Sequence, residues 1–430
     1  MLGSEMSIRL GRSRLSSARR PRGPLLVYVG TFCYLVTVFG NVNPLRKLVL
    51  GLPVLVLIGA LADARTRERL RRGIVPLGLT AFLAWMGISY FWSVDRHNSG
   101  HQILEVLLVS IAGGFLACSL HRHELIHMIA LATRISVAIT AASLVVAHHW
   151  ATKTAVGATA GWHGPFGQKN SLGFALAIGL VAMYFESPRP RRYLAWMLVA
   201  IALLVGSHSA GSWVSTLVAA AVLAWITLAA GTPTVRRRLL LMAGSLVALA
   251  LAVWFLVADF RTVAGVLGKK PNLTGRTSIW DAVVNAFYVH PWHGYGYGAV
   301  WLNSSGETAR LWHAIGFRAY EAHEVWLDLL LQVGVVGCLL MVLVLAGAFT
   351  RSLRMRPWEL PTAAWLLMTL VVLVVDGFVE SDLIGDTMFL VAVVIIATRI
   401  PYRHQGGEPG IAAGEPSGQA LDLVGNLDGH

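Results

Sequence analysis

Long apolar stretches follow one another along most of this 430-residue chain, and they constrain its fold more than any single motif does. A bilayer core about 30 Å thick requires about 20 mostly apolar residues in each helix that crosses it. Stretches that meet or approach this requirement are found at 24–40, 46–62, 74–92, 102–120, 127–147, 171–185, 193–206, 212–230, 239–259, 325–349, 360–378 and 386–398. The pattern predicts an all-α polytopic integral membrane protein with about twelve transmembrane helices.

The composition agrees with this fold class. Hydrophobic residues make up 56% of the chain and charged residues only 13%, whereas soluble chains carry about 25% charged residues. Too few polar groups are present to cover a soluble globule, so the composition excludes a cytosolic enzyme, a disordered protein and a fibrous protein. The cysteines, Cys33, Cys118 and Cys338, lie inside apolar stretches. Neither a disulfide framework nor a cysteine zinc site is therefore predicted.

The arginines indicate which links between the spans are cytoplasmic. If residues 1–23, which are basic, lie in the cytoplasm, every second link is also cytoplasmic, and most of these links are strongly basic. The clusters are Arg65, Arg67, Arg69, Arg71 and Arg72, then Arg189, Arg191 and Arg192, then Arg236 to Arg238, and finally Arg351, Arg354 and Arg356. The formal net charge of +13 is thus a sign of membrane topology, and no nucleic-acid partner is predicted.

This topology divides the chain into five regions and places both termini in the cytoplasm. They are a basic cytoplasmic tail at 1–23, spans one to nine at 24–259, an extracytoplasmic loop at 260–324, spans ten to twelve at 325–400, and a disordered cytoplasmic tail at 401–430. The loop between spans nine and ten is the longest link, and it is rich in aromatic and basic residues. Long links of this kind usually carry function.

Inside the loop, Thr277 to Tyr288 has the apolar spacing of an amphipathic helix, which Thr277 or Ser278 is expected to cap. Its apolar face is expected to lie on the membrane surface or on the helix bundle. Arg276 comes just before this helix. A guanidinium at a helix N-terminus either binds an oxyanion or phosphate, or simply contacts water and lipid headgroups.

His323 stands at the mouth of span ten. A histidine there is either a general base, since its ordinary pKa is near neutrality, or an interfacial residue without a role. The segment from His323 to Leu327 begins like a zinc-protease helix, but leucine stands where that motif needs a second histidine. No metal site is predicted there, and the glycine repeat from His293 to Gly298 is interpreted as a tight turn.

Three further charged positions have two interpretations each. Lys169 begins the sixth span and either meets an anion or extends to the interface. The last extracytoplasmic link holds four acids that either act on a cation or base, or mark the non-cytoplasmic side: Asp376, Glu380, Asp382 and Asp386. Arg134 lies within the fifth span, where a charge suggests a functional site by default, although it is near enough to the inner end to reach the interface.

Three segments, in this order and placement, resemble the O-antigen ligase and polymerase superfamily, especially its exopolysaccharide-production branch. The first is Gly164-Pro-Phe-Gly-Gln-Lys-Asn-Ser-Leu-Gly173. The second is Leu273-Thr-Gly-Arg-Thr-Ser-Ile-Trp-Asp281, with His290-Pro-Trp-His-Gly-Tyr-Gly-Tyr-Gly298 after it. The third is Ala322-His-Glu-Val-Trp-Leu-Asp328, followed by Leu331-Gln-Val-Gly-Val-Val-Gly337. Glu380-Ser381 also resembles the acidic position before the last span of the family.

The resemblance implies an inverting glycosyl transfer that needs neither metal nor cofactor. The implied donor is a glycan on polyprenyl diphosphate, and the acceptor hydroxyl belongs either to another lipid-linked glycan or to a surface lipid. His323 corresponds to the base of the family, Arg276 to its diphosphate clamp, and Lys169 to its basic residue before a middle span. Arg318 and Arg310 are predicted as further diphosphate contacts, and Glu380 as a substrate-site acid.

Two positions depart from the family pattern. Glu324 stands where the family often has asparagine, and it is predicted either to pair with His323 or to bind an acceptor sugar. The segment 207–211 lacks a basic residue that the family often has, which leaves the set of phosphate contacts incomplete. The function predicted is a surface polysaccharide polymerase in a bacterial plasma membrane, with its active site on the extracytoplasmic face. The alternatives are a ligase with a lipid acceptor and a transporter or flippase for a lipid-linked glycan.

Overall fold

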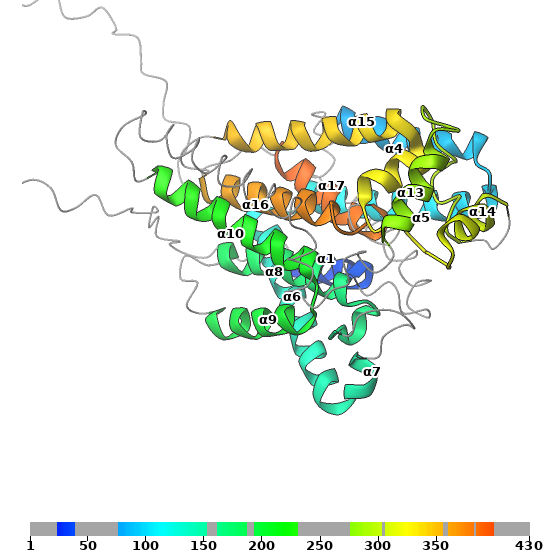
Figure 1. The fold of residues 1–430 in the computed structure, drawn as a ribbon. Coiled ribbons are helices and arrows are strands. Elements are labelled where there is room, and N and C mark those ends of the chain that lie inside the picture. Colours follow the sequence, from blue (N-terminus) through cyan, green and yellow to red (C-terminus); the bar gives the residue numbers. More distant parts are fainter. Residues whose placement is uncertain are drawn as a thin grey trace, which may run out of the picture. The chain divides into compact units, whose positions relative to one another are not determined.

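A computed structural model describes residues 24–38, 76–152, 161–186, 193–230, 276–302, 306–355, 360–381 and 384–399. These residues are all-helical and contain no strand (Figure 1). The α-helices are α1 (Pro24–Val38), α4 (Leu77–Ile88), α5 (Arg96–Ser119), α6 (Arg122–Val146), α7 (His148–Thr152), α8 (Lys169–Glu186), α9 (Leu194–Gly206), α10 (Ala210–Ala230), α13 (Arg276–Phe287), α14 (Gly306–Ile315), α15 (Val325–Leu353), α16 (Leu360–Gly377) and α17 (Met388–Ala397). Short 3₁₀ helices are η1 (Ser89–Trp92), η2 (Gly164–Phe166) and η6 (Gly385–Thr387).

A helix is found at each predicted span that falls within the described residues. The spans at 46–62 and 239–259, the two tails and the loop residues 260–275 lie outside them. Within the described residues, three helices are long and apolar enough to cross a membrane by length and composition: α5, α6 and α15. The other predicted spans appear as shorter helices, so the number of twelve crossings stays a prediction.

Small residues bring several of these helices close together. Helix α17 packs along α5, and α6 packs along α8 (Figure 1). A Cβ atom added to Gly113 of α5 would lie 2.2 Å from the carbonyl oxygen of Phe389 in α17, and one added to Gly179 of α8 would lie 2.1 Å from Cγ2 of Thr133 in α6. Close backbone contact of this kind supplies the packing on which helix association in a bilayer depends.

Helix α15 is broken at Gly334, where φ is +69°. The glycine repeat that follows α13 lies against this break and completes its hydrogen bonds. The amide of Tyr295 donates to the carbonyl of Leu331 (3.0 Å), and that of Val335 donates to the carbonyl of Pro291 (2.9 Å). The segment interpreted from sequence as a tight turn is therefore the brace that holds the first part of α15 in place.

Helix α13 corresponds to the predicted amphipathic helix and packs against α15 and α14. Ile279 and Val283 are buried on its inner face, in a small core that the loop segments share with Leu331 of α15. The helix already begins at Arg276. Thr277 and Ser278 consequently lie within its first turn, and the prediction that one of them caps the helix is wrong.

Candidate active site

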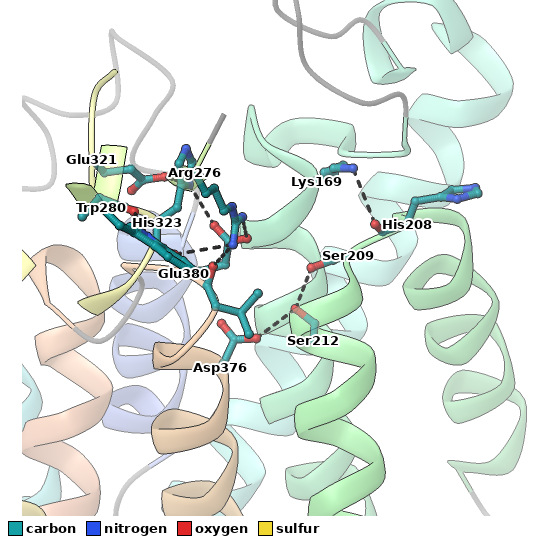
Figure 2. Close-up of polar contacts among 12 residues, drawn as sticks. Lys169, His208, Ser209, Ser212, Arg276, Trp280, Glu321, His323, Asp376 and Glu380 are labelled. Atoms are coloured by element: carbon teal, nitrogen blue, oxygen red, sulfur yellow. Dashed lines mark hydrogen bonds and ion pairs between the residues drawn. The ribbon is translucent and has the colours of Figure 1, made fainter. Parts of the chain in front are cut away.

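Arg276 and His323 meet on one buried carboxylate, that of Glu380 (Figure 2). Arg276 is the first residue of α13, His323 precedes α15, and Glu380 follows α16. Nη2 of Arg276 donates to Oε1 of Glu380 (2.5 Å), and Nδ1 of His323 lies 3.1 Å from Oε2. Nη1 of Arg276 also donates to the carbonyl of Val379. Both oxygens of Glu380 are thus engaged, and its side chain is only 5% exposed.

The backbone around His323 is irregular and firmly held. His323 has φ of +53°, which is uncommon for any residue other than glycine. The preceding residue, Ala322, is bonded on both sides: its amide donates to Asp328 (3.3 Å), and its carbonyl accepts from the indole of Trp280 (3.0 Å). Neighbouring groups that fix a strained residue in this way are typical of functional sites.

A second carboxylate, that of Glu321, also contacts His323. Its Oε1 lies 2.9 Å from Nδ1, the same ring nitrogen that faces Glu380. Burial lowers the pKa of His323, but the hydrogen bonds to Glu321 and Glu380 outweigh it and raise the pKa to about 10. Burial likewise raises the pKa of Glu380, but the charge of Arg276 and the hydrogen bond from His323 hold it below its usual range. The imidazole is therefore charged at neutral pH.

Glu321, His323 and Glu380 also have the composition of a cation site. Their potential ligand atoms lie within 4.8 Å of one another. The same atoms are accounted for by a proton on Nδ1 that both carboxylates accept, and the guanidinium of Arg276 already matches one of the two negative charges. We therefore assign a hydrogen-bonded group, called here the His323 cluster: Arg276, Glu321, His323 and Glu380.

A chain of polar contacts links Lys169 to this cluster (Figure 2). Nζ of Lys169, at the start of α8, lies 3.5 Å from the carbonyl oxygen of His208. The buried hydroxyl of Ser212 in α10 lies 3.0 Å from that of Ser209, next to His208, and donates to Oδ1 of Asp376 (3.2 Å). The carbonyl of Asp376 in turn accepts from the amide of Glu380 (2.9 Å). These hydrogen bonds, with the peptide link from His208 to Ser209, connect the lysine to the backbone at Glu380.

The structure places three other predicted site residues differently. Arg310 pairs with Glu307 on the exposed side of α14, and the guanidinium of Arg318 lies 5.4 Å from the ring centre of Trp312. Within the described residues, neither arginine contacts the His323 cluster. Glu324 does not pair with His323, so the first of its two predicted roles is wrong, and the second, binding of an acceptor sugar, stays a prediction. It caps α15 instead, with Oε2 accepting from the amide of Leu327 at 2.6 Å.

Glu324 is also buried, and burial affects its charge. Burial raises the pKa of Glu324 to about 7, and the hydrogen bonds from the amides of Leu327 and Trp326 oppose it only in part. The acid next to His323 in sequence is thus turned toward the helix backbone, and the acid two residues before it takes the place beside the ring.

The sequence did not indicate the roles of Glu321 or Ser212. Glu321 lies in an irregular turn, where no periodicity tells which side chains share a face. Ser212 and Asp376 are 164 residues apart, and only the packing of α10 against α16 brings them together. The signal in the sequence is weak: a run of serines in one apolar span and a single acid at the end of another.

Comparison with known proteins agrees with the sequence resemblance. The family model described as O-antigen ligase matches residues 195–342, which include Arg276, Glu321 and His323. This match and two curated relatives together support a place for the chain in the O-antigen ligase superfamily. Among curated relatives, the exopolysaccharide production protein ExoQ of Rhizobium meliloti is 30% identical over 234 residues, 51% of this chain and 54% of ExoQ. The O-antigen ligase of Pseudomonas aeruginosa is 25% identical over 312 residues, 70% of this chain and 71% of the relative.

The alignment to ExoQ thus spans about half the length of that relative. The similarity to this superfamily and the apolar helices together indicate a bacterial membrane protein, and the match to ExoQ supports an ExoQ-like branch.

Proposed function

We propose that this protein transfers a glycan from a polyprenyl-diphosphate carrier to an acceptor hydroxyl at the extracytoplasmic face of the membrane, as a surface polysaccharide polymerase. The observation that carries the proposal is the meeting of Arg276 and His323 on Glu380. This contact places a cation suited to bind phosphate next to a titratable side chain. The three residues come from three separate segments of the chain, so the contact is not a product of local structure.

The chemistry requires positive charge at the leaving group. When the bond between the anomeric carbon and the diphosphate breaks, negative charge develops on the diphosphate, and fixed cations lower the barrier by matching it. Arg276 is suited to this task because its guanidinium is already oriented by Val379 and Glu380. His323, charged and 31% exposed, is a second cation beside it.

Lys169 is proposed as the third positive contact of the donor. It lies at the carbonyl of His208, in the segment 207–211 that itself carries no basic residue. The polar network through Ser212 and Asp376 fixes α10 and α16 between Lys169 and the His323 cluster. A diphosphate with its first sugar would extend across this interval, with the acceptor hydroxyl on the side of His323.

The acceptor decides between two forms of the proposal. ExoQ is the more similar in identity, which favours a polymerase that extends a lipid-linked glycan. The match to the O-antigen ligase covers more of both chains, so a ligase that transfers the glycan to a surface lipid is kept as the second candidate. The donor, the leaving group and the site residues are the same in both.

Complementation of a gene deletion in the native host tests the proposal. The deletion strain receives the wild-type protein, His323→Ala or Arg276→Ala, and the amount of each protein in the membrane is checked. We expect single lipid-linked repeat units to accumulate in the deletion strain and neither variant to restore long chains. Arg310→Ala, altered at an exposed arginine that does not contact the His323 cluster, is the matched control and should restore them.

Two other outcomes distinguish the alternatives. Full-length chains that remain on the polyprenyl carrier would identify a ligase. Normal surface glycan with either His323→Ala or Arg276→Ala would contradict the proposed site and favour a transporter or flippase.

A further inference from the structure

The contacts of the His323 ring determine which of its nitrogens is protonated. Nδ1 lies within hydrogen-bonding distance of two carboxylate oxygens, Oε1 of Glu321 (2.9 Å) and Oε2 of Glu380 (3.1 Å). A carboxylate accepts and does not donate, so Nδ1 must carry a proton. A histidine that acts as a general base usually has one carboxylate behind it, which orients the ring. Here a second carboxylate stabilises the charged form of the ring further.

The two carboxylates differ in what remains available to a substrate. Glu380 is 5% exposed, and Arg276 and His323 occupy its two oxygens. Glu321 is 29% exposed and uses only Oε1 to contact His323. Among the described residues, no group is bonded to its Oε2. Within the described part of the chain, Glu321 therefore keeps one carboxylate oxygen without a hydrogen bond beside the ring of His323.

The other charged groups near the ring do not offer an unbonded, partly exposed carboxylate oxygen. Arg276 is a permanent cation, and it is bonded to Val379 and Glu380. The carboxylates of Glu324 and Asp328 on α15 are turned to the amides of Leu327 and Ala322. Glu321 is consequently the partly exposed base of the cluster, and the hydrogen bonds that Ala322 makes on both sides fix the turn that carries it.

We propose that Glu321, rather than His323, receives the proton of the acceptor hydroxyl, while His323 stays protonated and holds the leaving diphosphate together with Arg276. This inference rests on the proposed function. In a single displacement, the acceptor oxygen forms a bond to the anomeric carbon, and the bond from that carbon to the diphosphate oxygen breaks. The electron pair of the broken bond stays on the diphosphate, and the hydroxyl proton passes to the carboxylate of Glu321. A carboxylate is the usual base in single displacements at an anomeric carbon.

The test measures initial rates of transfer by the purified full-length protein between pH 6 and pH 10.5. The donor is the lipid-linked repeat unit extracted from the deletion strain. We expect the rate of the wild type to be constant from about pH 6 to pH 9 and to fall as the pH approaches 10, where His323 loses its proton. Glu321→Gln should lower the rate at pH 7.5 by about 100-fold or more, the usual effect of removing a general base. Glu321→Asp should regain part of it.

The alternative, in which His323 is the base, predicts the opposite sign. The wild-type rate would then rise about tenfold per pH unit toward pH 10, because only the neutral ring accepts a proton. Glu321→Gln would be faster than the wild type at pH 7.5, because the loss of one carboxylate lowers the pKa of His323. Either result would overturn the inference. So would transfer that EDTA abolishes and a divalent cation restores, since the three side chains would then be holding a metal.

Controls separate this inference from the proposed function. Glu307→Gln makes the same chemical change on α14, outside the cluster, and should keep the wild-type rate. Glu321→Gln should still bind polyprenyl diphosphate within about threefold of the wild type, which shows that the site is folded, whereas His323→Gln should bind it about tenfold more weakly. If the wild type transferred no glycan at any pH, the proposed function itself would fail. If transfer were normal in Glu321→Gln, only the inference would fail.

Discussion

Two groups in this protein contain the same three kinds of residue, yet they are built differently. In the His323 cluster, Arg276 and His323 meet on Glu380. In a second group, called here the Glu186 cluster, Arg134 and His127 meet on Glu186. Both Nη atoms of Arg134 donate to Glu186, Nη2 at 2.9 Å, and Nδ1 of His127 lies 2.5 Å from Oε1. In each group the shared carboxylate is almost fully buried, at 5% and 4% exposure.

The difference lies in the backbone and in one extra acid. Arg134 and His127 of the Glu186 cluster stand on regular turns of α6, and Glu186 is the last residue of α8. The guanidinium of Arg134 also lies over the ring of Tyr193, 4.8 Å from its centre. The residues of the His323 cluster stand at a helix start, at a position with φ of +53°, and just after a helix end. Among the described residues, only the His323 cluster has a second carboxylate on its histidine.

The comparison teaches that an arginine, a histidine and a buried glutamate do not by themselves make an active site. On regular helices the three residues tie α6 to α8. In an irregular region with Glu321 added, they leave a charged imidazole and a partly exposed carboxylate for a substrate.

The largest contrast is expected when each shared carboxylate is replaced by an amide. Glu380→Gln and Glu186→Gln both leave a buried arginine without its ion pair, which costs about 3–5 kcal/mol of folding stability. Only Glu380→Gln should lower transfer per folded molecule, by about 100-fold or more, because Arg276 and His323 lose their positions. The measurement is the initial rate of transfer divided by the amount of folded protein. Gel filtration in detergent gives the amount of folded protein. Equal losses per molecule in both variants would contradict the distinction.

A smaller effect is expected from the helix break that supports the His323 cluster. Gly334→Ala places a Cβ atom 2.3 Å from the carbonyl carbon of Trp292 at a positive φ, and should cost about 3 kcal/mol. Gly87→Ala, in α4 with no heavy atom within 4 Å of the added Cβ, should change stability by less than about 1 kcal/mol. Denaturant unfolding in detergent compares the two. Equal stabilities of the two variants would show that the segment around Trp292 does not pack tightly against Gly334.

The smallest contrast between variants is expected in how steeply thermal stability changes with pH. The pKa of His323 is about 10 in the folded protein, against an ordinary value of 6.5. The folded state therefore holds the proton more tightly, and the stability this gives is fully present below about pH 6.5 and lost as the pH rises through about 10. The melting temperature of the wild type should fall across this interval. In Glu321→Gln it should fall less, whereas Glu186→Gln should keep the wild-type slope. A Glu321→Gln slope equal to that of the wild type would contradict the role given to the second carboxylate.

The sequence predicted the helices well because apolar length and the positions of Gly, Pro and Arg are local signals. The helices at 24–38 and 325–353 begin at the predicted residue, and the amphipathic helix of the loop begins one residue earlier than predicted. The sequence also indicated that Arg276, His323 and Glu380 belong to one site, through the resemblance of their motifs to a family.

The parts that the sequence could not predict depend on contacts between distant segments. Nothing near Arg134 indicated that Glu186, 52 residues later, would pair with it instead of leaving it to reach the interface. Glu324 and Glu321 are both acids within two residues of His323, and only the start of α15 decides that Glu324 caps the helix while Glu321 turns to the ring. Arg310 and Arg318 were predicted from their charge and their place in the extracytoplasmic loop, and neither determines which partner a side chain contacts.

The most direct test of the central claim is transfer by the purified protein in lipid nanodiscs. Wild type, Arg276→Ala and Arg134→Ala would each be given the lipid-linked repeat unit, and the products analysed by mass spectrometry. The account predicts longer lipid-linked glycans with the wild type, none with Arg276→Ala, and wild-type transfer per folded molecule with Arg134→Ala. Longer glycans made by Arg276→Ala at the wild-type rate would contradict it.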